Sequence, residues 1–180
     1  LIQRWNPRIN LVAPATLPDI RQRHIDDSLQ IVDYAVPESG IWADLGSGGG
    51  LPGMVLAIAF ADRDVGFALV ESDQRKAAFL RTCIRELALE NATVHNARIE
   101  QVSPLNAAYL SARALAPLPK LMPYLQQHLA SDGKAFLMKG QNWQAELNNA
   151  RQNWSFEFKT HPSKTQLGSA ILEISGVRHV

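Results

Sequence analysis

Residues Ile41–Gly53 have the sequence IWADLGSGGGLPG and carry the strongest structural signal in the chain. Apolar residues lead into an acid at Asp44, five glycines fall within the eight positions from Gly46 to Gly53, and an apolar run, Met54–Ala61, follows. This order is typical of a buried strand, a glycine-rich turn and the start of a helix. Such a turn lets a ligand press directly against backbone N–H groups, so the sequence predicts a nucleotide- or cofactor-binding protein.

Strand and helix signals alternate beyond this turn. We expect strands at 41–45, 65–70, around Val94, at 107–112 and at 135–138, and helices at 51–61, 74–89, 118–129 and 143–152. Residues 154–160 and 169–175 alternate apolar and polar side chains, which suits a closing antiparallel pair of strands. The sequence therefore predicts an α/β protein with a mostly parallel, doubly wound sheet and an antiparallel C-terminal edge.

The part of the chain before the first strand has a different character. Residues 1–15 are polar and aromatic and contain two prolines, so we expect an irregular segment there. Thr16–Asp19 combines a threonine N-cap, an early proline and an acid, which predicts a helix, continuous or broken, up to Tyr34. Because the chain starts at Leu1 rather than at a methionine, we expect further residues to precede it.

Length and composition set broad limits on the protein. The 180 residues are 46% hydrophobic, which is enough for a core and argues against wholesale disorder. The single cysteine, Cys83, excludes an internal disulfide framework and fits a reducing cytoplasm. No apolar run is long enough to span a bilayer and no signal peptide is evident, so we expect a cytoplasmic protein without a membrane partner.

Charge gives a weaker indication. The net charge of +1 means that no global basic field points to a nucleic acid. The first 25 residues are nevertheless locally basic, with Arg4, Arg8, Arg21 and Arg23 against Asp19. This basic edge could hold a phosphate backbone or could be an ordinary solvated surface.

The glycine turn is compatible with two cofactors. Gly48–Gly53 satisfies the G-x-G-x-x-G pattern of dinucleotide sites, but a single match is weak. Asp44 opposes an anionic pyrophosphate and suits a cationic ligand such as S-adenosylmethionine, which has a sulfonium and an ammonium group and no phosphate. Pro52 removes an N–H that a pyrophosphate could have used. These residues favour S-adenosylmethionine over a dinucleotide, and a purely structural turn is the remaining alternative.

Two further acids extend the predicted cofactor site. Glu71 follows the second strand, where an acid can accept hydrogen bonds from two ribose hydroxyls; otherwise it is an exposed acid near a helix start. Ile99 could pack on an adenine face while Glu100 accepts from the adenine amino group, although a helix cap is equally compatible with this pair.

Several motifs spread over nearly the whole chain carry a family resemblance. They are Trp5-Asn6 with Asn10-Leu11, Arg23–Ser28 (RHIDDS), Asp44–Gly53, Glu71-Ser72 with Lys76 and Phe79-Leu80, Arg98–Glu100, Ser111–Ala114 (SARA) and Met138–Gly140 (MKG). On these motifs the chain resembles the bacterial 16S ribosomal RNA guanine-N7 methyltransferases, also called the glucose-inhibited division protein B family. The Arg-His-Ile-x-Asp-Ser block, together with a Leu-Pro-Gly ending, is much more specific than the glycine turn alone.

The resemblance implies a Rossmann-like, class I S-adenosylmethionine-dependent methyltransferase fold. It implies one domain over residues 1–180, with a helical, RNA-facing extension at 1–37 and a Rossmann-like core at 38–180. The substrate would be a guanine of 16S ribosomal RNA, free or in the small ribosomal subunit, and we expect a monomer. Carried over by motif, the cofactor contacts are Gly46, Leu51, Ile99, Glu100 and Arg113, and the general methyltransferase pattern adds Asp44, Gly48 and Glu71.

Two cations are the candidate catalytic residues. Arg113 and Lys139 follow the fourth and fifth strands, at the edge where ligands bind in such sheets. We expect Arg113 to line the cleft between cofactor and guanine, and Lys139 to meet a phosphate or the guanine edge; each could instead be a surface cation. Ala114–Pro117 (ALAP) departs from the family's more usual Ala-Phe-Ala or Ala-Val-Ala, which changes the expected cleft wall.

The chemistry of guanine explains why no catalytic dyad is evident. N7 has an in-plane lone pair and no proton, so it can attack a sulfonium methyl group without a general base. We expect catalysis through alignment and desolvation, with orientation worth roughly 7–11 kcal/mol. Cys83 lies inside an amphipathic helix and is expected to be structural rather than a nucleophile.

Several side chains and two function classes stay open. His24 and Asp26 could form a hydrogen-bonded pair over the cleft or contact RNA, whereas Trp143 and Trp154 are expected in the core rather than stacked on bases. No two histidines have metal-ligand spacing, so no metal is predicted. The alternatives to a methyltransferase are a nicotinamide-dependent oxidoreductase, for which no catalytic pair is evident, and a non-enzymatic RNA-binding module.

Overall fold

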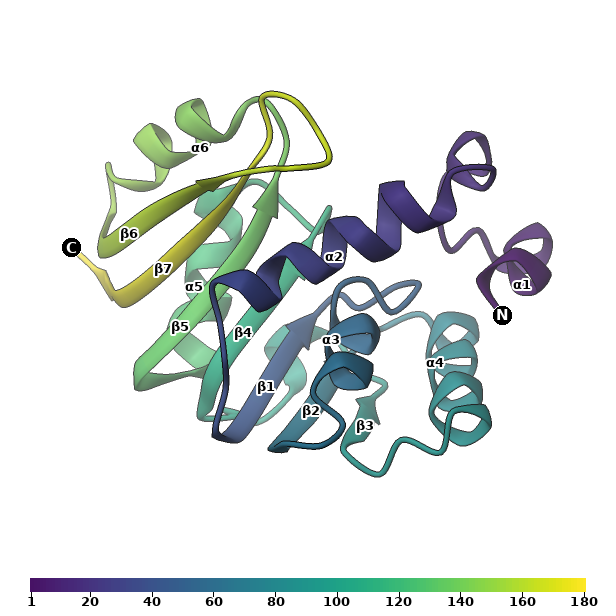
Figure 1. The fold of residues 1–180 in the computed structure, drawn as a ribbon. Helices are drawn as coiled ribbons and strands as arrows, with labels where there is room; N and C mark the ends of the chain where they lie inside the picture. The colour runs from purple at the N-terminus through teal and green to yellow at the C-terminus, as the bar shows by residue number, and fades with distance from the viewer.

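The computed structural model describes residues 1–180 and has a seven-stranded sheet at its centre, in the order β3-β2-β1-β4-β5-β7-β6 (Figure 1). The strands are β1 Ser39–Leu45, β2 Asp64–Val70, β3 Ala92–His95, β4 Ala107–Arg113, β5 Leu129–Lys139, β6 Trp154–Pro162 and β7 Ala170–His179. The first five strands are parallel, and β7 runs antiparallel to both β5 and β6. The predicted Rossmann-like sheet with an antiparallel C-terminal edge is confirmed.

Helices cover both faces of this sheet. They are α1 Ile2–Ile9, α2 Asp27–Leu29, α3 Gly53–Ala59, α4 Gln74–Glu86, α5 Leu118–His128 and α6 Trp143–Ala150. A π-helical turn, Arg21–Asp26, precedes α2 and a 3₁₀ turn, Gln30–Asp33, follows it, so that the three form one rod that crosses the sheet (dark blue in Figure 1). Shorter 3₁₀ turns lie at Pro14–Thr16 and Ile99–Gln101.

Each face of the sheet has its own hydrophobic core. On one face, apolar residues of α5 and α6 pack against the sheet, and the buried Trp154 joins them with Trp143 at the margin. On the other face, α3, α4 and Ile31 pack around Trp42, whose ring stacks with those of Tyr109 and Phe67 at centroid distances of 5.2 and 5.6 Å. The core position expected for Trp154 is confirmed, and none of the helices is long and apolar enough to cross a membrane.

Some predicted element boundaries are wrong. Residues 2–9 form the helix α1 rather than an irregular segment, because α1 gains tertiary packing: the Trp5 ring meets the edge of Phe79 in α4 at 5.6 Å. Strand β5 begins at Leu129, well before the predicted Ala135, because its pairing with β4 continues past a register shift. Contacts with distant parts of the chain decide where these elements begin, and the local sequence does not encode such contacts.

The N-terminal segment differs from the predictions in its side-chain bonds as well. Thr16 is not an N-cap; it ends a 3₁₀ turn, and its hydroxyl donates to the Ala13 carbonyl at 2.7 Å. His24 does not pair with Asp26, whose carboxylate lies 3.8 Å from Arg21 near the surface. The helical region predicted up to Tyr34 exists, but it begins around Arg21 and changes its hydrogen-bond spacing twice.

Candidate functional site

The glycine turn joins β1 to α3 and can fold this way only with glycine at particular positions. Gly48 has φ of +53°, a backbone conformation that residues with a Cβ rarely adopt, and a Cβ there would meet nothing closer than the Gly46 carbonyl at 3.7 Å. At Gly53 a Cβ would lie 2.5 Å from the Cβ of Asp44, so no larger residue fits. The turn is therefore packed against β1 on its inner side and open at Gly48.

Glu71 holds the turn from the neighbouring strand. Its Oε2 accepts a hydrogen bond from the Gly48 N–H at 2.8 Å, and its Oε1 accepts one from the Asp73 N–H at 2.7 Å. Each carboxylate oxygen keeps a further lone pair, so a ribose hydroxyl could still donate to Glu71. The structure thus brings together two of the predicted cofactor residues, Gly48 and Glu71, at the carboxyl ends of β1 and β2.

Asp44 is almost completely buried at the end of β1, with 1% of its surface exposed. Its Oδ1 accepts a hydrogen bond from the Ser111 hydroxyl at 2.6 Å, and that hydroxyl accepts one from the Trp42 indole at 3.0 Å. Burial raises the pKa of Asp44 to about 6, against the lowering effects of Ser111 and the nearby Gly53 N–H. Oδ2 nevertheless has no hydrogen-bond partner, and such a carboxylate favours a cation nearby.

Two other predicted cofactor residues, Leu51 and Gly46, pack against apolar neighbours. Leu51 is buried in a small cluster with Val12 and Val55, which fixes the start of α3 against the N-terminal segment. Gly46 faces Leu115, because a Cβ at Gly46 would lie 2.6 Å from the Leu115 Cδ1. Both residues shape the turn, and a direct contact with a cofactor stays a prediction for each.

Ile99 and Glu100 lie after the edge strand β3. Ile99 is buried in the core on the α5 side, and its carbonyl lies 3.1 Å from Nε2 of the buried His128. Glu100 is exposed, 4.0 Å from Arg98. Both residues therefore lie at the carboxyl edge of the sheet, as the glycine turn does, but two strands away from it. The Ile99 side chain points inward and the Glu100 carboxylate points outward.

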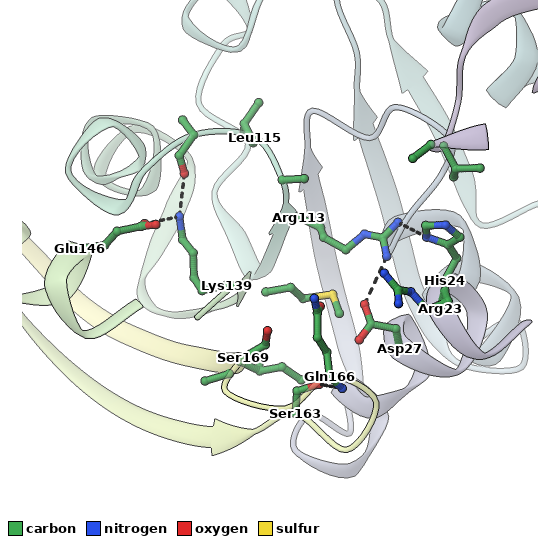
Figure 2. Close-up of a pocket in the computed structure, with 18 of the residues that line it drawn as sticks. Arg23, His24, Asp27, Arg113, Leu115, Lys139, Glu146, Ser163, Gln166 and Ser169 are labelled. Carbon is green, nitrogen blue, oxygen red and sulfur yellow. Dashed lines mark hydrogen bonds and ion pairs between the residues drawn. The ribbon is translucent and has the colours of Figure 1, made fainter. Parts of the chain in front are cut away.

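A cavity of about 630 Å³ lies beside the turn (Figure 2). Its walls come from residues 11–13, from the rod that carries His24 and Asp27, from 113–117 at the end of β4, from 138–140 at the end of β5, and from the β6–β7 loop with the start of β7. Leu11 and Leu115 line the cavity and also pack on the glycines of the turn. The order of the sheet reverses between β1 and β4, which is where ligands bind in such folds.

Arg113 reaches across the cavity wall to the N-terminal rod. Its Nη1 lies 3.2 Å from the Asp27 Oδ2 and its Nη2 lies 3.1 Å from the His24 Nδ1, as Figure 2 shows. The side chains of Arg113 and Asp27 are 18% and 14% exposed, so this ion pair is largely shielded from water. Two partners fix the plane of the guanidinium, and its remaining N–H groups are free for a ligand.

The environment of His24 keeps its ring neutral. The Thr16 hydroxyl donates to the Ala13 carbonyl, so it accepts from the His24 Nε2, which lies 2.6 Å away. We therefore assign the proton to Nε2 and leave Nδ1 as the acceptor for Arg113. Burial, and then the charge of Arg113, lowers the pKa of His24, which agrees with this assignment.

Lys139 is held on the other side of the cavity. Its Nζ donates to the Ala116 carbonyl at 2.6 Å and lies 2.9 Å from the Glu146 Oε2, which also accepts from the Leu118 N–H at 2.7 Å. This arrangement ties the end of β5 to the loop after β4 and to α6 (Figure 2). The ammonium would have to leave these partners to meet RNA, so the predicted RNA contact of Lys139 stays a prediction.

Sequence reasoning missed the residues that join the rod to the β6–β7 loop. The Asp27 Oδ1 accepts from the Thr165 hydroxyl and from the Gln30 Nε2. The Gln30 Oε1 accepts from the Lys164 N–H at 2.5 Å. Asp27 belongs to the RHIDDS block and could have been found from it, whereas Gln30 and Thr165 carry no local signal.

Cys83 is not part of the site. It is buried in the core between α4 and the sheet, and burial raises the pKa of its thiol to about 11. A thiolate is therefore absent near neutral pH, which confirms the structural interpretation of this cysteine. No three His, Cys, Asp or Glu side chains come together in a metal-binding arrangement.

The geometry suits a cationic cofactor at the turn. Asp44 and Glu71 place two carboxylates beside the glycines, and one buried oxygen of Asp44 lacks a partner. The open side at Gly48 leaves room for a ligand against the backbone. These carboxylates favour a positively charged methyl donor over an anionic pyrophosphate.

Known proteins with similar sequences and structures agree. The family model described as "GidB: rRNA small subunit methyltransferase G" matches residues 1–174. "Ribosomal RNA small subunit methyltransferase G" of Paracoccus denitrificans (strain Pd 1222) is 56% identical, covering 99% of this chain and 92% of the relative. A SAM-dependent methyltransferase from Aquifex aeolicus has a TM-score of 0.68 at 10% identity, covering 87% of this chain and 93% of that one.

A structure that contains the cofactor has the same fold. TYW2 of M. jannaschii, in complex with AdoMet, has a TM-score of 0.65 at 12% identity, covering 87% of this chain and 76% of that one. At this identity the likeness establishes the fold, which is that of class I S-adenosylmethionine-dependent methyltransferases.

Proposed function

The chain belongs to the rRNA small subunit methyltransferase G family, and from this premise we propose that it transfers a methyl group from S-adenosylmethionine to N7 of a guanine in 16S ribosomal RNA. One structural observation carries the proposal. The glycine turn, with its acidic neighbours, lies next to a 630 Å³ cavity, because Leu11 and Leu115 contact the turn and also line the cavity. The turn would hold the cofactor and the cavity would receive the guanine. A nicotinamide-dependent oxidoreductase is not compatible with this family.

The residues of the turn would bind the cofactor. Glu71 can accept from the ribose hydroxyls while it holds the Gly48 N–H, and the carboxylate of Asp44 attracts positive charge to the turn. We keep Ile99 and Glu100 as the proposed adenine contacts, and Gly46 and Leu51 as residues that shape the pocket. When bound, S-adenosylmethionine supplies an electrophilic methyl group on a sulfonium.

The cavity would orient the guanine and exclude water. No residue has to remove a proton, because N7 has none, and His24 already uses both ring nitrogens in hydrogen bonds. We propose that Arg113, held by His24 and Asp27, donates to an oxygen of the bound nucleotide and so aligns N7 with the methyl group. Lys139 fixes the loop that carries Leu115 and is the proposed second cation near the RNA.

We propose that the active form is a monomer. We place the reaction in the cytoplasm, on 16S RNA or on the assembled small subunit. Oligomeric state can be measured by sedimentation under assay conditions. Separate assays with protein-free RNA and with small-subunit particles distinguish the two substrates.

Labelled methyl donor and undermethylated small-subunit RNA or particles test the proposed function directly. We expect one methyl group per RNA, mapped to N7 of a guanine. A methyl group on another atom, or none on either substrate, contradicts the proposal. The conversion must also be supported by S-adenosylmethionine and not by NAD.

The variants Arg113→Ala and Arg113→Lys test the proposed role of Arg113. We expect both to lower kcat at least about tenfold, which corresponds to about 1.4 kcal/mol, because lysine keeps the charge but cannot contact His24 and Asp27 together. Far-UV circular dichroism should show an unchanged fold. Turnover equal to that of the wild type would refute this role.

A further inference from the structure

Positive charge is concentrated on two helices that the proposed chemistry does not use. α1 and α4 together carry Arg4, Arg8, Arg75, Lys76, Arg81 and Arg85, with Glu86 as their only acid. They therefore hold six of the eighteen Lys and Arg residues of the chain and one of its seventeen Asp and Glu residues. Since the whole chain has a net charge of +1, everything outside these two helices is net negative.

The two helices enclose a groove of about 520 Å³. It is lined by Arg4, Trp5, Arg8, Ile9, Arg75 and Ala78, and we call it the α1–α4 groove. The three arginines are exposed, whereas Trp5 and Ile9 are half-buried and form an apolar floor. The groove thus combines a rim of guanidinium groups with an aromatic surface.

The guanidinium groups of the groove are available to a ligand. Arg8 makes no ion pair. Arg4 lies 3.3 Å from Glu86 and Arg75 lies 3.5 Å from Asp73, but the arginine side chains are 66% and 71% exposed. Ion pairs with this exposure contribute little free energy, so an incoming anion can replace them.

A short segment of chain links the groove to the proposed guanine cavity. Asn6 in α1 accepts hydrogen bonds from the N–H groups of Leu11 and Val12 at 2.8 and 2.9 Å, and Leu11 and Val12 line the cavity. Arg75 stands in the first turn of α4, shortly after Glu71 at the carboxyl edge of the sheet. The groove and the cavity therefore lie along one short, tightly fixed segment of chain.

We propose that the α1–α4 groove binds the phosphate backbone of the ribosomal RNA next to the target guanine. The inference rests on the proposed function, because it takes the RNA substrate as the occupant. Guanidinium groups bind phosphates through paired hydrogen bonds, and the floor formed by Trp5 can pack against a ribose or a base. This division of tasks would let a nearly neutral chain bind RNA, because the positive charge is concentrated on α1 and α4.

The double variant Arg8→Glu/Arg75→Glu tests the groove. We expect its affinity for protein-free 16S RNA fragments to fall at least about tenfold, and the slope of log K against log salt to become shallower by about 0.7 for each lost contact to single-stranded RNA. The matched control is Lys120→Glu/Arg178→Glu, which reverses two exposed cations away from the groove. The control should bind RNA like the wild type, and calorimetry should give both variants the wild-type affinity for S-adenosylmethionine.

Three outcomes overturn the proposal. Wild-type RNA affinity and salt slope in the groove variant would exclude a phosphate contact there. An equal loss in the control variant would show a general charge effect. A loss confined to assembled subunits, with normal binding of protein-free RNA, would assign the groove to a ribosomal protein.

Methyl incorporation by the wild type separates this proposal from the proposed function. If the wild type binds RNA through the groove but methylates no guanine, the proposed function is refuted and the proposed RNA contact of the groove is supported. If the wild type methylates guanine and the groove variant shows an unchanged KM for RNA, the proposed RNA contact of the groove is refuted and the proposed function is supported.

Discussion

Asp44 is a buried acidic residue whose protonation affects the stability of the protein. Its carboxylate is buried, and one of its oxygens has no hydrogen-bond partner. Its pKa is raised from 3.8 to about 6 by burial, so the folded protein holds the proton more tightly than the unfolded chain does. The stabilisation by this proton is complete below about pH 3.8 and is lost as the pH rises through about 6.

The variant Asp44→Asn tests this linkage. A shift of this size corresponds to about 3 kcal/mol, and asparagine has no charge to bury. From about pH 4 to about pH 7 we expect the free energy of unfolding of the variant to gain up to about 3 kcal/mol relative to the wild type. Urea denaturation at several pH values measures the difference.

The exposed Asp62 supplies the control for that experiment. Asp62→Asn should keep a constant offset from the wild type over the same pH range. A constant offset for Asp44→Asn as well would mean that Asp44 does not titrate with a raised pKa. Added S-adenosylmethionine should shift the wild-type profile to lower pH, because a nearby cation stabilises the carboxylate.

At the scale of elements, the rod around α2 and the β6–β7 loop form one wall of the cavity, and the buried amide of Gln30 joins them together with Asp27. Gln30 is 4% exposed. Its Nε2 donates to the Asp27 carbonyl at 3.0 Å and to the Thr165 hydroxyl at 3.1 Å, and its Oε1 accepts from the Lys164 N–H. Removal of this amide takes a hydrogen-bond partner from the partly buried Asp27 and Thr165 and from the Lys164 N–H.

The variant Gln30→Ala should therefore loosen the loop. We expect a loss of about 1–2 kcal/mol in the free energy of unfolding, since each hydrogen bond of this kind contributes about 0.5–1.5 kcal/mol. Amide hydrogen exchange at residues 163–169 should accelerate more than exchange in β1 or β4. The matched control, Gln22→Ala, changes an exposed glutamine in the same rod and should leave both measurements unchanged.

Elements with strong local signals could be predicted from the sequence, and those set by distant contacts could not. The turn at Gly46–Gly53 and the strands beside it follow from glycine spacing and apolar runs. The helix α1 contains Pro7 and has a polar composition, and it is fixed by the contact between Trp5 and Phe79. Distant contacts also explain why the partners of the site residues could not be predicted. Arg113 could be placed at the end of a strand, but its partner His24 is 89 positions away in the sequence.

At the scale of the whole molecule, the fold gathers segments that share no local pattern. The cavity takes walls from the N-terminal segment, from the ends of β4 and β5, and from the β6–β7 loop. The sheet order brings the ends of β4 and β5 together, and the contacts of Arg113 and Gln30 add the rod and the β6–β7 loop. Any ligand that bridges the glycine turn and the cavity should therefore stabilise the native state as a unit.

The thiol of Cys83 reports on that global stability. It is 4% exposed and its pKa is raised to about 11, so a thiol reagent reacts only after the surrounding core has opened. If opening is in rapid equilibrium, the labelling rate follows the population of the open form. Native protein should react far more slowly than protein unfolded in urea, and Cys83→Ala should retain methyl transfer, because no enzyme thiolate takes part.

Cofactor binding should then protect this thiol by a calculable amount. S-adenosylmethionine at a hundred times its Kd stabilises the native state by about 2.7 kcal/mol, so labelling should slow about a hundredfold. NAD at the same concentration should give no protection, which distinguishes the methyl donor from the dinucleotide that also matches the glycine spacing. Equal protection by both ligands, or rapid labelling of the native protein, would contradict the buried position of Cys83 or the preference of the acidic turn for a cation.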